Sequence, residues 1–194
     1  MRIVAGRWRG KKLAEVGAGD MAAHLRPTTD RVRENLFNIL CSGKQGDPIT
    51  GARVLDLFAG TGALGLEALS RGAAHVTFVD DGATARGLLR ENIALCAAQG
   101  VTTLLRRDAT DLGLAAAAPF ELIFLDPPYG KGLGARALVA ARAGGWIAPG
   151  ALIVWEDNSA PLVPDGFTLR DQRSYGGTVI TLLRADQGFG ASAE

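Results

Sequence analysis

The chain has 194 residues, of which 47% are apolar, a length that suits one domain with a buried core and is short for two. Its 21 Lys and Arg residues nearly balance its 20 Asp and Glu residues, so the formal net charge is +1. This balance excludes a charge-rich disordered chain and a uniformly basic polyanion-binding domain. The 26 glycines, nearly twice the usual share, indicate many tight turns.

The cysteines and the first residues of the chain indicate the cellular compartment of the protein. Cys41 and Cys96 are far apart and belong to no Cys-x-x-Cys motif or His-containing cluster, so neither a zinc site nor a disulfide framework is expected. Residues 1–13 are basic and lack the apolar core of a secretory signal, and no stretch approaches the roughly 18 apolar residues of a membrane span. We therefore expect a cytoplasmic protein that has no metal and does not associate with membranes.

The first fifty residues differ in pattern from the rest of the chain. Residues 2–13 predict a β-hairpin, which a loop connects to a helix over residues 30–40. The stripe of this helix that we expect to be buried comprises Val32, Leu36, Phe37, Ile39 and Leu40. Arg31 and Arg33 are expected to lie off that stripe. Residues 1–50 are therefore predicted to form an extension of the main domain.

Strand and helix patterns alternate between residues 51 and 186. The apolar runs that predict strands are residues 53–58, 75–79, 102–105, 120–125 and 151–155. The segments with helical periodicity are residues 63–69, 83–98 and 133–143. Strands separated by helices imply right-handed crossovers and a parallel sheet.

The last two strand patterns break this alternation. Residues 167–173 and 178–183 are joined by Ser174-Tyr175-Gly176-Gly177, which is a hairpin spacing and not a crossover. We therefore expect an α/β, doubly wound, Rossmann-like fold with a mainly parallel seven-stranded sheet and an antiparallel strand at its C-terminal edge. Residues 187–194 are expected to form a flexible tail.

A glycine-rich turn follows the first strand of this domain. Gly60, Gly62 and Gly65 form a G-x-G-x-x-G pattern, in which glycine lets the backbone turn tightly and lets a ligand approach the amides of a helix N-terminus. Asp80 ends the next strand, where a carboxylate can accept both hydroxyl hydrogens of a ribose. A dinucleotide or another adenosine cofactor fits both features.

Two more aspartates bear on the choice of cofactor. A fixed negative charge at Asp56, just before the glycine loop, would repel a diphosphate and suit an ammonium or sulfonium group. Asp108, after the third strand, can accept a hydrogen bond from an adenine amino group or cap a following helix. The candidate cofactor-binding residues are Asp56, Phe58, Gly60, Thr61, Gly62, Asp80, Asp108 and Ala109.

The sequence Asp126-Pro127-Pro128-Tyr129 directly follows the apolar run 120–125 and supplies the candidate catalytic residues. Open sheets bind ligands at the carboxyl ends of their strands, and two prolines make this corner stiff. Two acceptors, the Asp126 carboxylate and the Pro127 carbonyl, can hold an exocyclic aromatic amine so that its lone pair points at an electrophilic methyl group. Tyr129 can stack on the base. Methyl transfer would then rely mainly on positioning, with Asp126 or water accepting the proton.

These motifs resemble those of class I S-adenosylmethionine-dependent amino-methyltransferases. Residues 2–13, 25–37 and 65–72 narrow the resemblance to the bacterial RsmD family, over nearly the whole chain from Arg2 to about Leu183. The resemblance implies a class I methyltransferase fold and methyl transfer from S-adenosylmethionine, leaving S-adenosylhomocysteine, to N2 of a guanine in 16S ribosomal RNA. We further expect a monomer that acts on 16S ribosomal RNA, either free or within a small-subunit ribosomal particle.

The resemblance also implies roles for single residues. Gly60 and Gly62 would line the cofactor loop, Asp108 would meet the adenine, and residues 126–129 would hold the guanine amine. Members of the family commonly carry Glu where Asp80 stands, so Asp80 and the adjacent Asp81 compete for the ribose.

The near-neutral total hides an uneven distribution of charge. Residues 1–33 hold eight Lys and Arg against three acidic residues, a net +5, which leaves −4 for residues 34–194. Trp8 between two arginines suits phosphate contact and base stacking, and the alternative is a solvated hairpin face with Trp8 packed on the core. The candidate RNA-binding residues are Arg7, Trp8, Arg9, Lys11, Lys12, Arg26, Arg31 and Arg33.

Three other functions share some of these features. A DNA adenine-N6 or cytosine-N4 methyltransferase uses the same Asp-Pro-Pro-Tyr chemistry, but enzymes that act on duplex DNA flip the base and usually add a recognition domain. An NAD-dependent oxidoreductase uses the same glycine pattern, yet the sequence has no substrate domain and only the histidines His24 and His75. A noncatalytic RNA-binding module accounts for the basic extension and leaves the acidic motifs unexplained.

Overall fold

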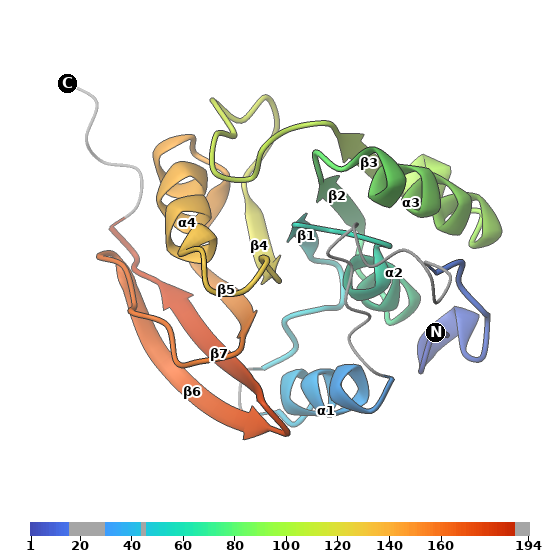
Figure 1. The fold of residues 1–194 in the computed structure, drawn as a ribbon, viewed down its shortest axis with the longest axis horizontal. Helices are drawn as coiled ribbons and strands as arrows, with labels where there is room; N and C mark the ends of the chain where they lie inside the picture. Colours follow the sequence, from blue (N-terminus) through green and yellow to red (C-terminus); the bar gives the residue numbers. More distant parts are fainter. Residues whose placement is uncertain (16–29, 44–45, 189–194) are drawn as a thin grey trace.

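The fold is built on a seven-stranded sheet (Figure 1). The computed structural model describes residues 1–15, 30–43 and 46–188. The strands are β1 (Arg53–Leu57), β2 (His75–Val79), β3 (Thr102–Leu105), β4 (Phe120–Leu125), β5 (Ile147–Asp157), β6 (Phe167–Tyr175) and β7 (Thr178–Ala185). Their order across the sheet is β3-β2-β1-β4-β5-β7-β6.

Strands β1 to β5 pair in parallel, because the segments between them return the chain to the same end of the sheet. Strand β7 runs antiparallel to both β5 and β6, and β6 is outermost. The turn between β6 and β7 is Gly176-Gly177, whose φ angles of 53° and 91° suit a tight two-residue hairpin. The predicted α/β fold with a mainly parallel sheet is confirmed.

Helices cover both faces of the sheet. They are α1 (Asp30–Leu40), α2 (Ala63–Ser70), α3 (Ala83–Leu95) and α4 (Leu133–Ala143), with short 3-10 turns η1 (Gly6–Trp8) and η3 (Gln99–Val101). Side chains of α1, α2 and α3 pack on one face and those of α4 on the other, and Figure 1 shows α4 across β4 and β5 from α2. No helix within the described ranges is both long and apolar enough to cross a bilayer.

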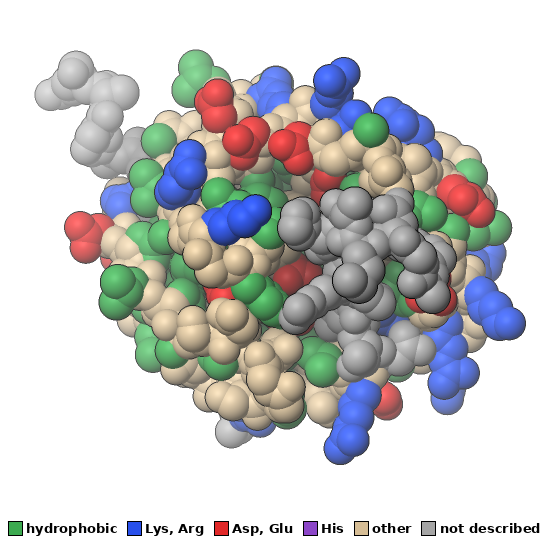
Figure 2. Space-filling model, in the orientation of Figure 1, with side chains coloured by type: hydrophobic (Ala, Val, Ile, Leu, Met, Phe, Trp, Pro, Cys, Tyr) green, Lys and Arg blue, Asp and Glu red, His purple; other side chains and the backbone are tan. Residues whose placement is uncertain are grey.

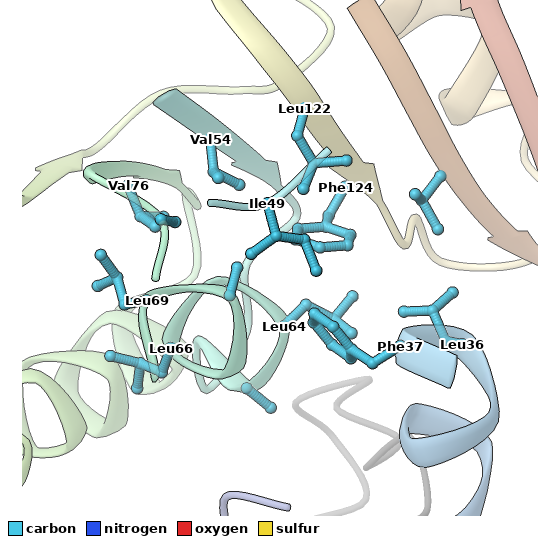
Figure 3. Packing of buried hydrophobic residues seen from close by; sticks show 14 of the residues in the cluster. Leu36, Phe37, Ile49, Val54, Leu64, Leu66, Leu69, Val76, Leu122 and Phe124 are labelled. Carbon is cyan, nitrogen blue, oxygen red and sulfur yellow. The ribbon is translucent and has the colours of Figure 1, made fainter. Parts of the chain in front are cut away.

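The core has two layers because successive side chains of a strand face opposite sides of the sheet. In β1, Val54 packs in the layer with α1 and α2, whereas Leu55 and Leu57 pack in the layer with α4. Figure 3 shows the first layer, in which Phe37 of α1 and Phe124 of β4 point toward each other. Their ring centroids are 5.7 Å apart. This contact fixes α1 against the centre of the sheet.

Helix α1 buries the apolar stripe that the sequence predicts. Leu36, Phe37, Ile39 and Leu40 are buried, and Val32 is partly buried against the same cluster. The prediction that Arg33 lies off the stripe is wrong, because its side chain is 0% exposed. Its guanidinium donates a hydrogen bond to the carbonyl of Arg2, and its Nε lies 3.9 Å from Glu67 Oε2. Arg33 therefore joins α1 to the start of the chain and to α2.

The N-terminal extension pairs with itself as the predicted hairpin requires. Arg2 and Lys12 form an antiparallel bridge, and Ile3 N donates to Lys11 O at 2.9 Å. The reversal between these segments contains η1. Ile3 and Leu13 belong to the buried cluster of α1 and α2, so the extension is part of the main core. Residues 16–29, which include most of the loop predicted after the hairpin, and residues 189–194 of the tail predicted at 187–194 lie outside the described residues.

Candidate active site

Three adjacent parallel strands end together at one edge of the sheet. Leu57 of β1 is level with Val79 of β2 and with Leu125 of β4. The residues that follow these three are Phe58, Asp80 and Asp126. The structure therefore brings together the glycine loop, the carboxylate after β2 and the Asp-Pro-Pro-Tyr corner.

The loop between β1 and α2 has a backbone that favours glycine. The φ angles are 58° at Phe58, 56° at Gly60 and 78° at Gly62, all in the left-handed region. Gly62 is the N-cap of α2, and a side chain there would collide with a leucine of α3. A Cβ at Gly65 would collide with the ring of Phe78, so this glycine allows α2 to approach β2 closely.

Asp80 is tied directly to this loop. Its Oδ2 accepts a hydrogen bond from Gly60 N at 2.8 Å, and its Oδ1 accepts one from Gly82 N at 2.8 Å. Burial raises the pKa of Asp80 above its ordinary value, and the two amide hydrogen bonds partly offset the rise. Asp81 is exposed, and its carbonyl accepts a hydrogen bond from Arg86. Of the two adjacent aspartates, Asp80 is the one that contacts the glycine loop.

Asp56 is buried, and its carboxyl has a partner within the fold. Its Oδ2 accepts a hydrogen bond from Gly65 N at 2.9 Å. Burial raises the pKa of Asp56 to about 8, the Gly65 hydrogen bond partly offsets this rise, and the charge of Asp80 adds to it. The raised pKa argues against the fixed negative charge that the sequence analysis expects at this position. Asp56 holds the first turn of α2.

Asp108 lies in the loop after β3. Its Oδ1 accepts hydrogen bonds from the backbone amide and the hydroxyl of Thr110, at 2.7 and 2.8 Å. These bonds lower the pKa of the exposed Asp108 carboxyl, so it is charged at neutral pH. A turn follows Asp108, so the alternative role as a helix cap is wrong. Ala109, next in the chain, is buried.

The Asp-Pro-Pro-Tyr corner leaves β4 next to the ends of β1 and β5. The Asp126 amide donates a hydrogen bond to Leu57 O at a distance of 3.5 Å. Tyr129 is half-buried, and its hydroxyl donates a hydrogen bond to Glu156 Oε1 at a distance of 3.5 Å. Burial, with the nearby carboxylates of Glu156 and Asp126, raises the pKa of Tyr129 to about 12, so the hydroxyl keeps its proton. The tyrosine ring is thus tied to the end of β5.

Glu156 is a residue of this site that the sequence analysis did not single out. It is buried at the end of β5, and Trp155 before it is level with Leu125. Glu156 therefore lies next to the start of the corner, on the adjacent strand. Its position directly after an apolar strand could have identified it, because Asp80 and Asp126 follow apolar strands in the same way.

The predicted RNA-binding residues differ in their exposure. Those that are exposed are Arg7, Arg9, Lys11, Lys12 and Arg31. Trp8 is partly buried against the core, and the guanidinium of Arg7 lies 4.0 Å from the centroid of its ring, in a cation–π contact. The prediction that Arg33 contacts RNA is wrong, because this side chain is buried and held by Glu67. Arg26 lies outside the described residues.

Charge is arranged unevenly on the face that Figure 2 shows. Acidic side chains lie in a hollow near the middle of this face and also along its upper part and margins, where most of its Lys and Arg side chains lie. In the part of the chain that the structure describes, no three His, Cys, Asp or Glu side chains are grouped so that they could hold a metal ion.

The strand order, the glycine loop and the corner after β4 define a Rossmann-like class I methyltransferase fold. The structure of yhhF from Escherichia coli has the same fold, with a TM-score of 0.79 and 37% identity over 96% of this chain and 98% of that chain. A methylase structure from Haemophilus influenzae gives a TM-score of 0.74 and 32% identity over 95% of this chain and 98% of that chain. These similarities extend to the whole domain and the N-terminal extension.

The chain belongs to the family described as "Conserved hypothetical protein 95", whose model matches residues 1–184. It is 37% identical over 190 residues to the ribosomal RNA small subunit methyltransferase D of Escherichia coli K12, covering 96% of this chain and 90% of that protein. A protein of the same name from Haemophilus influenzae is 36% identical over 181 residues, covering 91% of this chain and 89% of that protein. The resemblance to the RsmD family is confirmed, and the protein is a member of a methyltransferase family.

Proposed function

We propose that the protein transfers a methyl group from S-adenosylmethionine to the exocyclic N2 of a guanine in 16S ribosomal RNA. The observation that carries this proposal is that Asp80, bonded to the glycine loop, and the Asp126 corner follow β2 and β4, the two neighbours of β1. Asp80 and the glycine loop suit an adenosine cofactor, and the Asp126 corner suits an aromatic amine. Two relatives are named as ribosomal RNA small subunit methyltransferases, which supports ribosomal RNA as the substrate.

The residues around the glycine loop fit S-adenosylmethionine. Gly60 and Gly62 keep the backbone open to a ligand at the start of α2, and Asp80 has the location to accept hydrogen bonds from a ribose. Asp108 is charged and would accept a hydrogen bond from the adenine amine. Phe58, Thr61 and Ala109 would contact the cofactor from the same loops. When bound, S-adenosylmethionine supplies an electrophilic methyl group.

Asp56 has a different role in this proposal from the one that the sequence suggests. Its carboxyl is buried and bonded to Gly65 N, so it would shape the loop from within the fold and would not pair with the cofactor's charge. The positive charge of the cofactor would then be met mainly by the acidic groups at the edge of the sheet.

The Asp-Pro-Pro-Tyr corner would orient the guanine. The Asp126 carboxylate and the Pro127 carbonyl would each accept one hydrogen of the amine, which favours a pyramidal nitrogen with its lone pair directed at the methyl group. Pro128 keeps the corner stiff, and the Tyr129 ring would stack on the base. The methylated ammonium is acidic enough to give its proton to Asp126 or to water, so no strong general base is needed.

The exposed cations of the extension would contact the RNA backbone. Arg7, Arg9, Lys11, Lys12 and Arg31 are the candidates within the described residues, with Trp8 as an aromatic contact, and Arg26 remains a candidate beyond them. Part of Trp8 packs on the core, so only its exposed part would be available to the RNA. The proposal includes a monomer that acts in the cytoplasm on a small-subunit particle.

Two assays test this proposal. Isothermal titration calorimetry should detect binding of S-adenosylmethionine and no binding of NAD, and the reverse result would favour an oxidoreductase. A labelled methyl group should be transferred to small-subunit particles from an Escherichia coli strain that lacks its own relative, and not to duplex DNA. Labelling of DNA alone would favour a DNA adenine or cytosine methyltransferase.

A further inference from the structure

A buried asparagine connects the glycine loop to the N-terminal extension. Asn92 lies on α3, and its side chain is 0% exposed. Its Oδ1 accepts a hydrogen bond from Ala14 N at 2.7 Å, and its Nδ2 donates to Ala14 O at 3.0 Å and to Thr61 O at 2.9 Å. One amide thus satisfies both backbone groups of an extension residue and the carbonyl of a loop residue.

The glycine loop is held from two directions as a result. The amide of Gly60 is bonded to Asp80 of the adjacent strand end, and the carbonyl of Thr61, the next residue, is bonded to Asn92. The Thr61 hydroxyl also lies 3.9 Å from the sulfur of Met1. The conformation of the loop therefore depends on contacts with the first fifteen residues of the chain as well as on the sheet.

Two polar residues of α2 anchor the same extension. The buried Glu67 carboxylate accepts hydrogen bonds from Val4 N at 2.7 Å and Ala5 N at 2.9 Å. The hydroxyl of Ser70 donates to Ala5 O at 2.6 Å and accepts from Trp8 N at 3.0 Å. Since α2 begins at the glycine loop, the extension is bonded both to the loop and to the helix that follows it, and Figure 1 shows the N-terminal segment beside α2.

We propose that Asn92 is a positioning residue that couples the cofactor site to the N-terminal extension. Cofactor binding would fix the glycine loop, and the Thr61–Asn92–Ala14 bonds would transmit this order to the extension. Such coupling is reciprocal, so a ligand that orders the extension would strengthen cofactor binding by the same factor. The inference rests on the proposed function, because it takes the glycine loop to be the cofactor site and the extension to be the RNA surface.

Amide hydrogen exchange in the unmodified protein tests this coupling with S-adenosylhomocysteine as the probe. The Ala14 amide, bonded to Asn92, should exchange at least about 5-fold more slowly when the probe is bound. The Asp186 amide donates to Gly166 O at 3.0 Å near the far edge of the sheet, and its exchange should not change. Calorimetric binding without slower exchange at Ala14 would overturn the coupling alone. Absence of binding would overturn the proposed function and this inference with it.

A pair of variants on α3 assigns the effect to one side chain. Asn92→Ala should weaken binding of S-adenosylhomocysteine by about 5-fold or more and remove the protection at Ala14. Glu91→Ala, on the exposed side of the same helix, should match the unmodified protein in both respects. Protection at Ala14 that persists in a folded Asn92→Ala protein would overturn the role of Asn92. If this variant does not fold, the exchange measurement on the unmodified protein still decides whether the coupling exists.

Discussion

The Asp80 carboxylate and the Gly60 amide share a hydrogen bond of 2.8 Å, which joins the end of β2 to the glycine loop after β1. The other carboxylate oxygen accepts from Gly82, so the orientation of the whole group is fixed by the fold. A group that is oriented before its ligand arrives loses little entropy on binding. This arrangement distinguishes Asp80 from its exposed neighbour Asp81.

Substitution of Asp80 should therefore weaken cofactor binding far more than substitution of Asp81. Asp80→Ala should weaken binding of S-adenosylmethionine by about 10- to 100-fold, since hydrogen bonds to a charged group contribute about 1.5–3 kcal/mol. Asp81→Ala should leave affinity within about 2-fold of the unmodified protein. Isothermal titration calorimetry measures both. A larger loss for Asp81→Ala would assign the ribose to Asp81.

The Tyr129 side chain separates a ring contribution from a hydroxyl contribution. The ring is proposed to stack on the target base, whereas the hydroxyl donates a hydrogen bond to Glu156 Oε1. Tyr129→Phe should keep methyl transfer within a few-fold of normal, and Tyr129→Ala should lose about 1–3 kcal/mol of RNA binding. Filter binding and initial rates on ribosomal RNA measure these effects. Equal damage from both substitutions would refute stacking as the main role.

Asp56 makes the free energy of unfolding depend on pH. Its pKa is about 8 in the folded protein against an ordinary value of 3.8, so the folded state binds more protons between these two values. The contribution of this group to stability is therefore largest at low pH, falls as the pH rises through that window, and levels off above about pH 8.

The variant Asp56→Asn keeps an acceptor for Gly65 N and removes the titration. As the pH rises from about 5 to about 8, the unfolding free energy of this variant should increase by at least about 1 kcal/mol relative to that of the unmodified protein. Urea denaturation at several pH values measures the difference. Parallel pH profiles for the two proteins would show that the buried carboxyl does not titrate as described.

The exposed cations of the extension should govern the salt dependence of RNA binding. Replacing Arg7, Arg9, Lys11 and Lys12 by Ala should weaken binding and reduce the slope of log affinity against log salt by up to about 0.7 per lost phosphate contact on a single strand. Arg170→Ala with Arg173→Ala removes exposed charge from β6 and should leave the slope nearly unchanged. An equal reduction by the two sets would mean that RNA does not favour the extension.

The strands and helices were predictable wherever burial leaves a periodic mark on the sequence. Residues 133–143 and 120–125 match α4 and β4, because each is an apolar pattern bounded by glycine or proline. Helix α3 ends at Leu95, short of the predicted residue 98, and Ala97 there has a positive φ of 49°. Strand β5 begins at Ile147, before the predicted residue 151, and its pairing with β4 shifts register between Phe120 and Leu122. Such irregularities have no periodic signal.

The polar groups that organise the site were less predictable than its motifs. Asp80 and the Asp126 corner stand out because they follow apolar strands. Asn92 and Glu67 lie within helices and gain their roles from Ala14 and Val4, which are distant in sequence. Arg33 was misassigned for the same reason: its partner Glu67 pulls it into the interior, and only the folded chain brings the two together.

The most direct test of the account is to map the methylated atom with and without Asp126. The unmodified protein should produce N2-methylguanine in 16S ribosomal RNA from cells that lack this modification, as detected by mass spectrometry of the digested RNA. Asp126→Ala should give no product while binding S-adenosylmethionine within about 3-fold of normal, because it removes a contact with the reacting amine only. A methyl group on any other atom, or near-normal turnover by Asp126→Ala, would contradict the account.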